Sequence, residues 1–97
     1  MNTINLNTEE ITNICQENDV AMLAVFGSVA RGEATEQSDV DLLVRFSERK
    51  GLLALVRLER VFSETLGRKV DLLTEAAISP YIRDHILNDL QVLYGSR

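Results

Sequence analysis

The hydrophobic and polar positions of this chain alternate between runs typical of strands and spacings typical of helices. A continuous apolar run from Val20 to Phe26 has the length of a strand that is covered on both faces. Asp39 to Phe46 predicts a second strand, which begins with alternating carboxylates and ends apolar, and Lys69 to Thr74 predicts a short third strand. Because these strands are separated by helical segments, the pattern predicts an α/β (α+β) fold with a small mixed β-sheet packed with helices.

Two helices are predicted around the first strand. Asn7 can cap the first of them, and Glu10 completes a pattern like a capping box. Its apolar side consists of Ile11, Ile14 and Cys15. Directly after the first strand, Ser28 to Gly32 predicts a short helix, and Glu33 to Ser38 reads as a polar loop.

Two more helices are predicted beyond the second strand. The first runs from Gly51 to about Leu66, with Gly67 as its C-terminal stop. The stripe expected to face the core consists of Leu52, Leu55, Leu58, Phe62 and Leu66. Ser79 and Pro80 mark the start of the last helix, as N-cap and first helical position. Its apolar side is expected to be Ile82, Ile86 and Leu90. Gln91 to Tyr94 fits either a last strand or the tail of that helix.

Composition narrows the class of protein. With 97 residues, of which 45% are hydrophobic, we expect a single soluble domain spanning residues 1–97. The net charge of −5 argues against a long nucleic-acid substrate, whose phosphates would require a basic surface. The single cysteine excludes an internal disulfide, and neither a signal peptide nor a membrane-length apolar run is present. We therefore expect a cytoplasmic protein that does not bind membranes.

The candidate functional residues are Gly27-Ser28 and, after a further ten residues, Asp39-Val40-Asp41. Gly27 ends a buried strand, where the chain must turn sharply and can leave room for a ligand against the backbone. Ser28 adds a hydroxyl at the start of a predicted helix, where free N–H groups collect. This turn is therefore a candidate phosphate site.

Asp39 and Asp41 are two residues apart on a predicted strand, so alternation places both side chains on one face, with Cα atoms about 7 Å apart. Two like charges in this position are unfavourable unless a cation lies between them. Carboxylate oxygens are ligands that Mg²⁺ accepts, and two such ions can hold the attacking and leaving oxygens of a phosphoryl displacement. Asp71, between Val70 and Leu72 on the third strand, is the candidate for a further carboxylate.

Each feature alone has an ordinary structural explanation. A Gly-Ser pair after a strand is usually a turn, and Asp-x-Asp is commonly a solvated strand end. Asp71 could simply pair with Arg68 or Lys69. Together, however, the turn and the three carboxylates suit a single reaction, a phosphoryl displacement assisted by metal ions.

These motifs, within Phe26-Gly-Ser-Val-Ala-Arg-Gly and Ser38-Asp-Val-Asp-Leu-Leu-Val44, resemble the signature of the polymerase-β-type nucleotidyltransferase superfamily. Within it, the chain is similar to the minimal nucleotidyltransferases called MNT. The resemblance implies that Gly27 and Ser28 hold the triphosphate of ATP. It also implies that the metals, two Mg²⁺ ions, are bound by Asp39, Asp41 and Asp71, which are the catalytic residues.

The resemblance also implies a partner. MNT proteins commonly act as antitoxins paired with HEPN-type ribonuclease toxins, and some attach AMP to a tyrosine of the toxin. We therefore expect a Mg²⁺-dependent nucleotidyltransferase that moves AMP from ATP onto a partner hydroxyl. Two alternatives stay open: an antitoxin that acts by direct binding without catalysis, and a small-molecule transferase of the antibiotic-modifying type. The sequence does not decide whether the chain forms a homo- or hetero-oligomer.

A few further residues have more than one possible role. Arg31 is either a phosphate contact or a surface residue that pairs with Glu33 or Glu36. His85, Tyr81 and Tyr94 are expected to be structural or surface residues, although the two tyrosines are also candidate self-modification sites. Apolar residues beside the core stripe of the third predicted helix could form a protein interface: Leu53, Val56 and Val61.

Overall fold

The computed structural model describes residues 8–35 and 37–96, so the predicted cap Asn7 and the ion-pair candidate Glu36 lie outside the described residues. The elements in chain order are α1 (Thr8–Glu17), β1 (Val20–Phe26), α2 (Gly27–Ala30), β2 (Val40–Phe46), α3 (Leu52–Leu66), β3 (Val70–Thr74), the short 3₁₀ helix η1 (Glu75–Ala77), α4 (Pro80–Asp89) and β4 (Gln91–Gly95). The segment after α4, for which the sequence allowed a strand or a helix tail, is therefore a strand.

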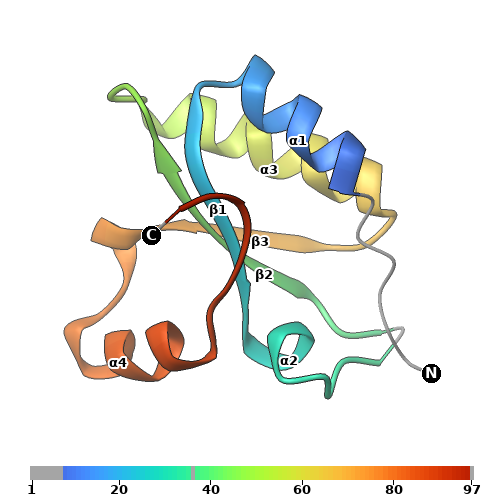
Figure 1. Ribbon diagram of the computed structural model, residues 1–97, viewed down its shortest axis with the longest axis vertical. Coiled ribbons are helices and arrows are strands. Elements are labelled where there is room, and N and C mark those ends of the chain that lie inside the picture. The colour runs from blue at the N-terminus through green and yellow to red at the C-terminus, as the bar shows by residue number, and fades with distance from the viewer. Residues whose placement is uncertain (1–7, 36, 97) are drawn as a thin grey trace.

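The four described strands form one mixed sheet in the order β3-β2-β1-β4 (Figure 1). β1 pairs antiparallel with both β2 and β4, whereas β2 and β3 run parallel and are connected through α3. This parallel pair matters for function, because it brings the first residues of β2 and β3 to the same end of the sheet.

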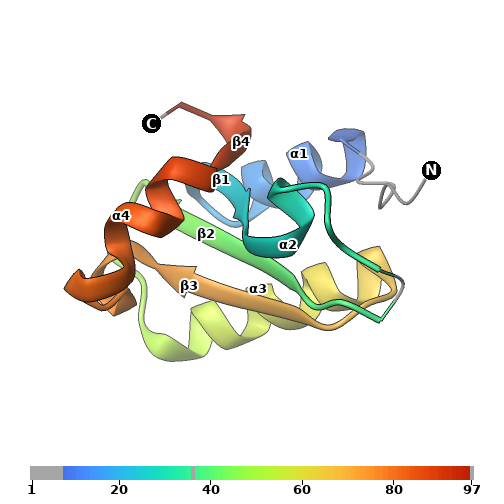
Figure 2. The same cartoon turned by 90° about the horizontal axis from the view of Figure 1, so that it is seen from below.

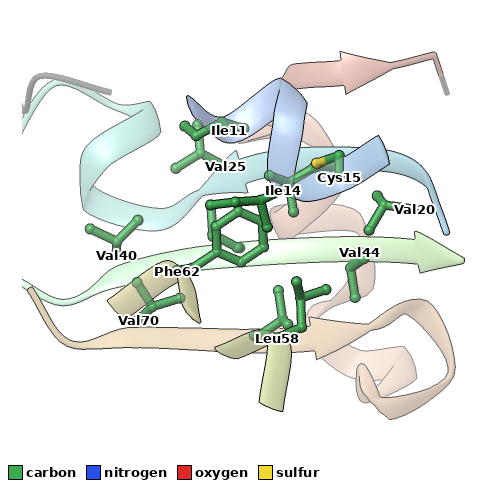
Figure 3. Packing of buried hydrophobic residues seen from close by; sticks show 13 residues of the cluster. Ile11, Ile14, Cys15, Val20, Val25, Val40, Val44, Leu58, Phe62 and Val70 are labelled. Atoms are coloured by element: carbon green, nitrogen blue, oxygen red, sulfur yellow. The ribbon is translucent and has the colours of Figure 1, made fainter. Parts of the chain in front are cut away.

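Helices cover both faces of the sheet. α1 and α3 lie together on one face, and α4 lies on the other, as the two views show (Figures 1 and 2). The larger hydrophobic cluster packs under α1 and α3, with the ring of Phe62 at its centre among side chains of α1, β1, β2 and β3 (Figure 3). A smaller cluster under α4 contains Met22, Ala24, Phe26, Leu43 and Ile78. Because β1 contributes to both clusters, its sequence is apolar at every position.

Side chains of α3 bond to the outer edge of β3. Val70 N–H donates to Ser63 Oγ at 3.2 Å, and Leu72 N–H donates to Glu59 Oε2 at 2.9 Å. The two acceptors are one helical turn apart, and the two donors are two residues apart on the strand. These bonds satisfy edge N–H groups on either side of Asp71 and so help to fix β3 in place.

Some details differ from the sequence prediction; for example, β3 begins at Val70 and not at Lys69, and Leu90, predicted on the apolar side of the last helix, lies just beyond α4. α2 spans Gly27–Ala30 rather than residues 28–32, and Asp39 precedes β2 instead of starting it. Leu52 and Ile82, predicted to face the core, are 75% and 50% exposed. Both residues lie in the first turn of their helices. The helical period predicts which side of a helix a residue occupies, but it does not predict whether the sheet extends far enough to cover that residue.

Within the described residues, no helix combines the length and apolar character needed to cross a membrane.

Candidate nucleotide and metal site

Asp41 and Asp71 are direct register partners on the parallel strands β2 and β3. Their chain neighbours Val40, Leu42 and Val70 belong to the cluster under α1 and α3. Because side chains alternate along a strand, both carboxylates point to the opposite face of the sheet, which is the α4 face. Both are half-buried. The parallel register thus places Asp71 beside Asp41, a relationship that the spacing of the two residues in the sequence does not contain.

Asp39 lies just before β2. Its Oδ2 is 3.8 Å from Nζ of Lys69, the residue that occupies the equivalent place before β3. The sequence offered Lys69 as a partner for Asp71, but in the structure this ammonium group approaches Asp39. Asp39 is also near enough to Asp41 to influence its protonation.

The three carboxylates interact electrostatically. The pKa of Asp41 is raised above its ordinary value of 3.8, first by burial and then by the negative charges of Asp71 and Asp39. The positive charge of Arg31 opposes this rise. A carboxylate that is disfavoured by its neighbours in this way is a natural place for a cation to bind.

Gly27 brings the backbone against this cluster. Phe26, the last residue of β1, is the register partner of Asp41, and Gly27 follows it with a φ of +74°. A Cβ atom at Gly27 would overlap Oδ2 of Asp41, so any other residue would strain the backbone and would also have to displace this carboxylate. The sequence predicted room for a ligand here, and the structure shows that the nearest neighbour on that side is a candidate metal ligand.

Ser28 lies in α2, a helix of a single turn. Phe26 occupies the N-cap position in an extended conformation and provides no side-chain cap to the first N–H groups of the helix. The Ser28 residue is half-buried next to Gly27. With four residues, α2 has only a small dipole, so backbone N–H groups are the main feature of this turn.

Arg31 pairs with two carboxylates. Its Nε is 3.2 Å from Glu33 Oε2, and its Nη1 is 3.2 Å from Asp89 Oδ2 at the end of α4. The pairing with Glu33 was one of the two sequence expectations, whereas Asp89 was not anticipated. Gln91 adds a second link between the end of α2 and the segment that follows α4, because its Nε2 donates to the carbonyl oxygen of Ala30 at 2.8 Å.

The donor set fits Mg²⁺. Among the residues that the structure describes, no three His, Cys, Asp or Glu side chains form a ready-made cage for an ion. Mg²⁺ does not require one, since it usually takes one or two carboxylates and completes its shell with water and substrate phosphates. Asp41 and Asp71 supply such a pair, with Asp39 next to them. Two surface hollows, one beside α1 and one near Thr74 at the far end of β3, contain none of the candidate residues.

Arg68 belongs to this region in a way that its sequence context does not reveal. The sequence suggests it only as a partner for Asp71, but its guanidinium donates to backbone carbonyls of the loop before Asp39. The only sequence signal is a pair of consecutive cations before a strand, which usually indicates a solvated turn.

Comparison with known proteins agrees with this geometry. Residues 8–93 match the nucleotidyltransferase domain family. A relative from Methanocaldococcus jannaschii, named "putative protein adenylyltransferase", is 45% identical over 86 residues, which cover 89% of this chain and 92% of the relative. The chain therefore belongs to the nucleotidyltransferase domain family, as the motif predicted, and its enzyme class is that of a nucleotidyltransferase.

Solved structures narrow the kind of nucleotidyltransferase. One described as a "putative minimal nucleotidyltransferase" shares 39% identity with a TM-score of 0.75, covering 87% of this chain and 86% of its own. Another, a complex of a tri-AMPylated HEPN toxin with an MNT antitoxin from Shewanella oneidensis, aligns with a TM-score of 0.70 at 20% identity, covering 93% and 71%. The second likeness shows a shared fold. The predicted mixed α/β fold and the resemblance to MNT proteins are both confirmed.

Proposed function

We propose that this protein transfers AMP from ATP to the hydroxyl group of a tyrosine on a HEPN-type toxin, and that it thereby acts as the antitoxin of the pair. The observation that carries the proposal is the juxtaposition of Gly27, Asp41 and Asp71. It sets a backbone turn suited to phosphate against two carboxylates in register on neighbouring strands. The name of the M. jannaschii relative supports AMP as the transferred group, and the Shewanella complex supports a toxin as its acceptor.

In this proposal Asp39, Asp41 and Asp71 hold Mg²⁺. Bound Mg²⁺ would neutralise charge on the triphosphate and lower the pKa of the attacking hydroxyl. The raised pKa of Asp41 supports a cation at this position, because a cation would relieve the repulsion from Asp71 and Asp39. The protein's own contribution is then mainly to position the reactants and to complement their charge.

Gly27 and Ser28 bind the triphosphate in the same scheme. The missing side chain at Gly27 leaves its backbone accessible next to Asp41, and the Ser28 hydroxyl adds one hydrogen bond to a phosphate oxygen. Arg31 contacts phosphate by exchanging its exposed partners Glu33 and Asp89 for the ligand, since such exposed ion pairs are weak.

The reaction proceeds by substitution at the α-phosphorus of ATP. The acceptor oxygen forms a bond to that phosphorus, the bond to the β-phosphate oxygen breaks, and pyrophosphate leaves. The proton of the acceptor hydroxyl passes to a carboxylate, for which Asp71 is our candidate. An AMP phosphodiester on the acceptor and free pyrophosphate are the products.

Intact-mass spectrometry of both proteins tests the proposal. The purified chain is incubated with a HEPN-type toxin, ATP and Mg²⁺, and the toxin is expected to gain one or more increments of about 329 Da, the mass of an added AMP group. Peptide mapping should then locate the increment on a tyrosine. A toxin that is inhibited at equal concentration without any mass change would contradict transfer and favour a binding antitoxin. Modification of an added aminoglycoside in place of the toxin would favour a small-molecule enzyme.

A further inference from the structure

Arg68 connects the strand that carries Asp71 to the loop that carries Asp39. It lies between α3 and β3, just after Gly67, which ends the helix with a φ of +66°. Its Nη2 donates to the carbonyl oxygens of Thr35 and Ser38, the latter at 2.6 Å. One guanidinium nitrogen thus bridges two backbone acceptors that are 33 and 30 residues away in sequence.

The loop segment that Arg68 holds is a compact turn. Ser38 N–H donates to the Thr35 carbonyl oxygen at 3.1 Å, and Thr35 N–H donates to Ser38 Oγ at 2.9 Å. The two hydroxyl oxygens lie 3.2 Å apart. Because these reciprocal bonds make the turn a unit, fastening its carbonyls to Arg68 fixes the position of the residue that follows, Asp39.

A second tether lies on the other side of Asp39. Val40 N–H donates to the Lys69 carbonyl oxygen at 3.0 Å, which is the first bond of the parallel pairing with β3. Asp39 therefore lies between two attachments to consecutive residues, Arg68 and Lys69, and these lead directly into the strand of Asp71. The position of Asp39 relative to Asp71 depends on both.

Arg68 is suited to hold the loop before Asp39 by its hydrogen bonds rather than by its charge. Its Nε is buried and has no hydrogen-bond partner among the described residues, so the group is partly removed from water, and its Nη2 donates to carbonyl oxygens. A positive charge near a cation site would by itself weaken metal binding. If Arg68 nevertheless favours metal binding, it must do so by holding the loop.

We propose that Arg68 is a positioning residue, which holds the Thr35–Ser38 turn so that Asp39 reaches the metal shared with Asp41 and Asp71. This inference rests on the proposed metal-dependent function and deepens it. Lys69 provides a matched comparison, because it is the adjacent residue, carries the same charge and approaches Asp39 directly at 3.8 Å. Charge alone predicts that neutralising either residue tightens metal binding, whereas the positioning role predicts opposite effects.

The test measures Mn²⁺ binding by electron paramagnetic resonance, with Mn²⁺ as the probe for the Mg²⁺ site and no nucleotide present. Relative to wild type, Lys69→Gln should bind Mn²⁺ more tightly, and Arg68→Gln should bind it about 10- to 100-fold more weakly, the range found for residues that orient metal ligands. Arg60→Gln, which removes an exposed arginine of α3, should leave the affinity unchanged. Thermal unfolding of each variant confirms that it is folded.

Ser38→Ala provides a second route if Arg68→Gln does not fold. It removes the acceptor of Thr35 N–H and loosens the turn while Arg68 is intact, so it should also weaken Mn²⁺ binding. Tighter or unchanged binding in a folded Arg68→Gln, or unchanged binding in Ser38→Ala, would overturn the positioning role and leave the proposed function in place. If Asp41→Asn binds Mn²⁺ as well as wild type does, the metal site itself is wrong and both proposals fail.

Discussion

The backbone of Gly27 lies so close to the carboxylate of Asp41 that a Cβ atom at position 27 would overlap Oδ2. A Gly27→Ala substitution should therefore displace a candidate metal ligand as well as strain the backbone at a φ of +74°. We expect it to abolish AMP transfer and to lower the free energy of unfolding by more than the roughly 1–2 kcal/mol that a left-handed conformation costs. Transfer assays and urea unfolding measure the two effects.

Gly32→Ala is the matched control. Gly32 has nearly the same φ, +73°, but nothing lies within 4 Å of the position that its Cβ would take. It should show the backbone cost of about 1–2 kcal/mol and retain transfer activity. Equal loss of activity in the two variants would mean that strain, and not contact with Asp41, explains the requirement for glycine.

Asp41→Asn should stabilise the metal-free protein at neutral pH. Burial and the charges of Asp71 and Asp39 raise the pKa of Asp41 above 3.8, so the folded state binds this proton more tightly than the unfolded state does. Folding stability is therefore lost as pH rises from about 3.8 through the raised pKa, and the amide avoids this loss. The expected increase in Tm, measured with EDTA at pH 7, should disappear below pH 3.8, where the wild-type carboxyl is protonated in both states.

Asp84→Asn, on an exposed position of α4, controls for the change in net charge. If it raises Tm as much as Asp41→Asn does, the stabilisation comes from the reduced overall negative charge and not from relief within the carboxylate cluster.

Much of this site follows from local sequence, but its assembly does not. Seven consecutive apolar residues define β1 with the bounds Val20–Phe26 that the structure has, and the Gly27-Ser28 turn follows from the break in that run. The register of Asp41 with Asp71 depends on parallel pairing across the α3 crossover, for which no local pattern exists. The bonds of Arg68 to the Thr35–Ser38 turn are equally non-local.

Arg31→Gln should separate nucleotide binding from stability. Both ion pairs of Arg31 are exposed and contribute little to stability, so Tm should change little. If Arg31 contacts the triphosphate, loss of this charge-assisted bond should raise the KM for ATP. Arg60→Gln, which breaks the exposed pair with Glu64, is the control and should leave KM unchanged. An unchanged KM in Arg31→Gln would leave Arg31 as a surface ion-pair residue only.

Glu59→Ala should destabilise the edge of the sheet that carries Asp71. The substitution removes the acceptor of the partly buried hydrogen bond that Leu72 N–H donates. We expect this loss to lower the free energy of unfolding in urea by about 1–3 kcal/mol. Glu59→Gln retains an acceptor oxygen and should recover most of that loss. Glu64→Ala removes a carboxylate from the exposed side of α3 and should cost less than about 1 kcal/mol. Similar losses in Glu59→Ala and Glu64→Ala would show that the bond to β3 contributes little.

The central claim, that the aspartate cluster carries metal-dependent AMP transfer, is tested most directly by transfer of label from α-³²P-ATP to a HEPN-type toxin. Wild type and Asp84→Asn should label the toxin when Mg²⁺ is present and not when EDTA is added. Asp41→Asn, although folded by its Tm, should give no labelling above background under the same conditions. Labelling by Asp41→Asn at the wild-type rate, or labelling that persists in EDTA, would contradict the assignment of Asp39, Asp41 and Asp71 as the catalytic metal site.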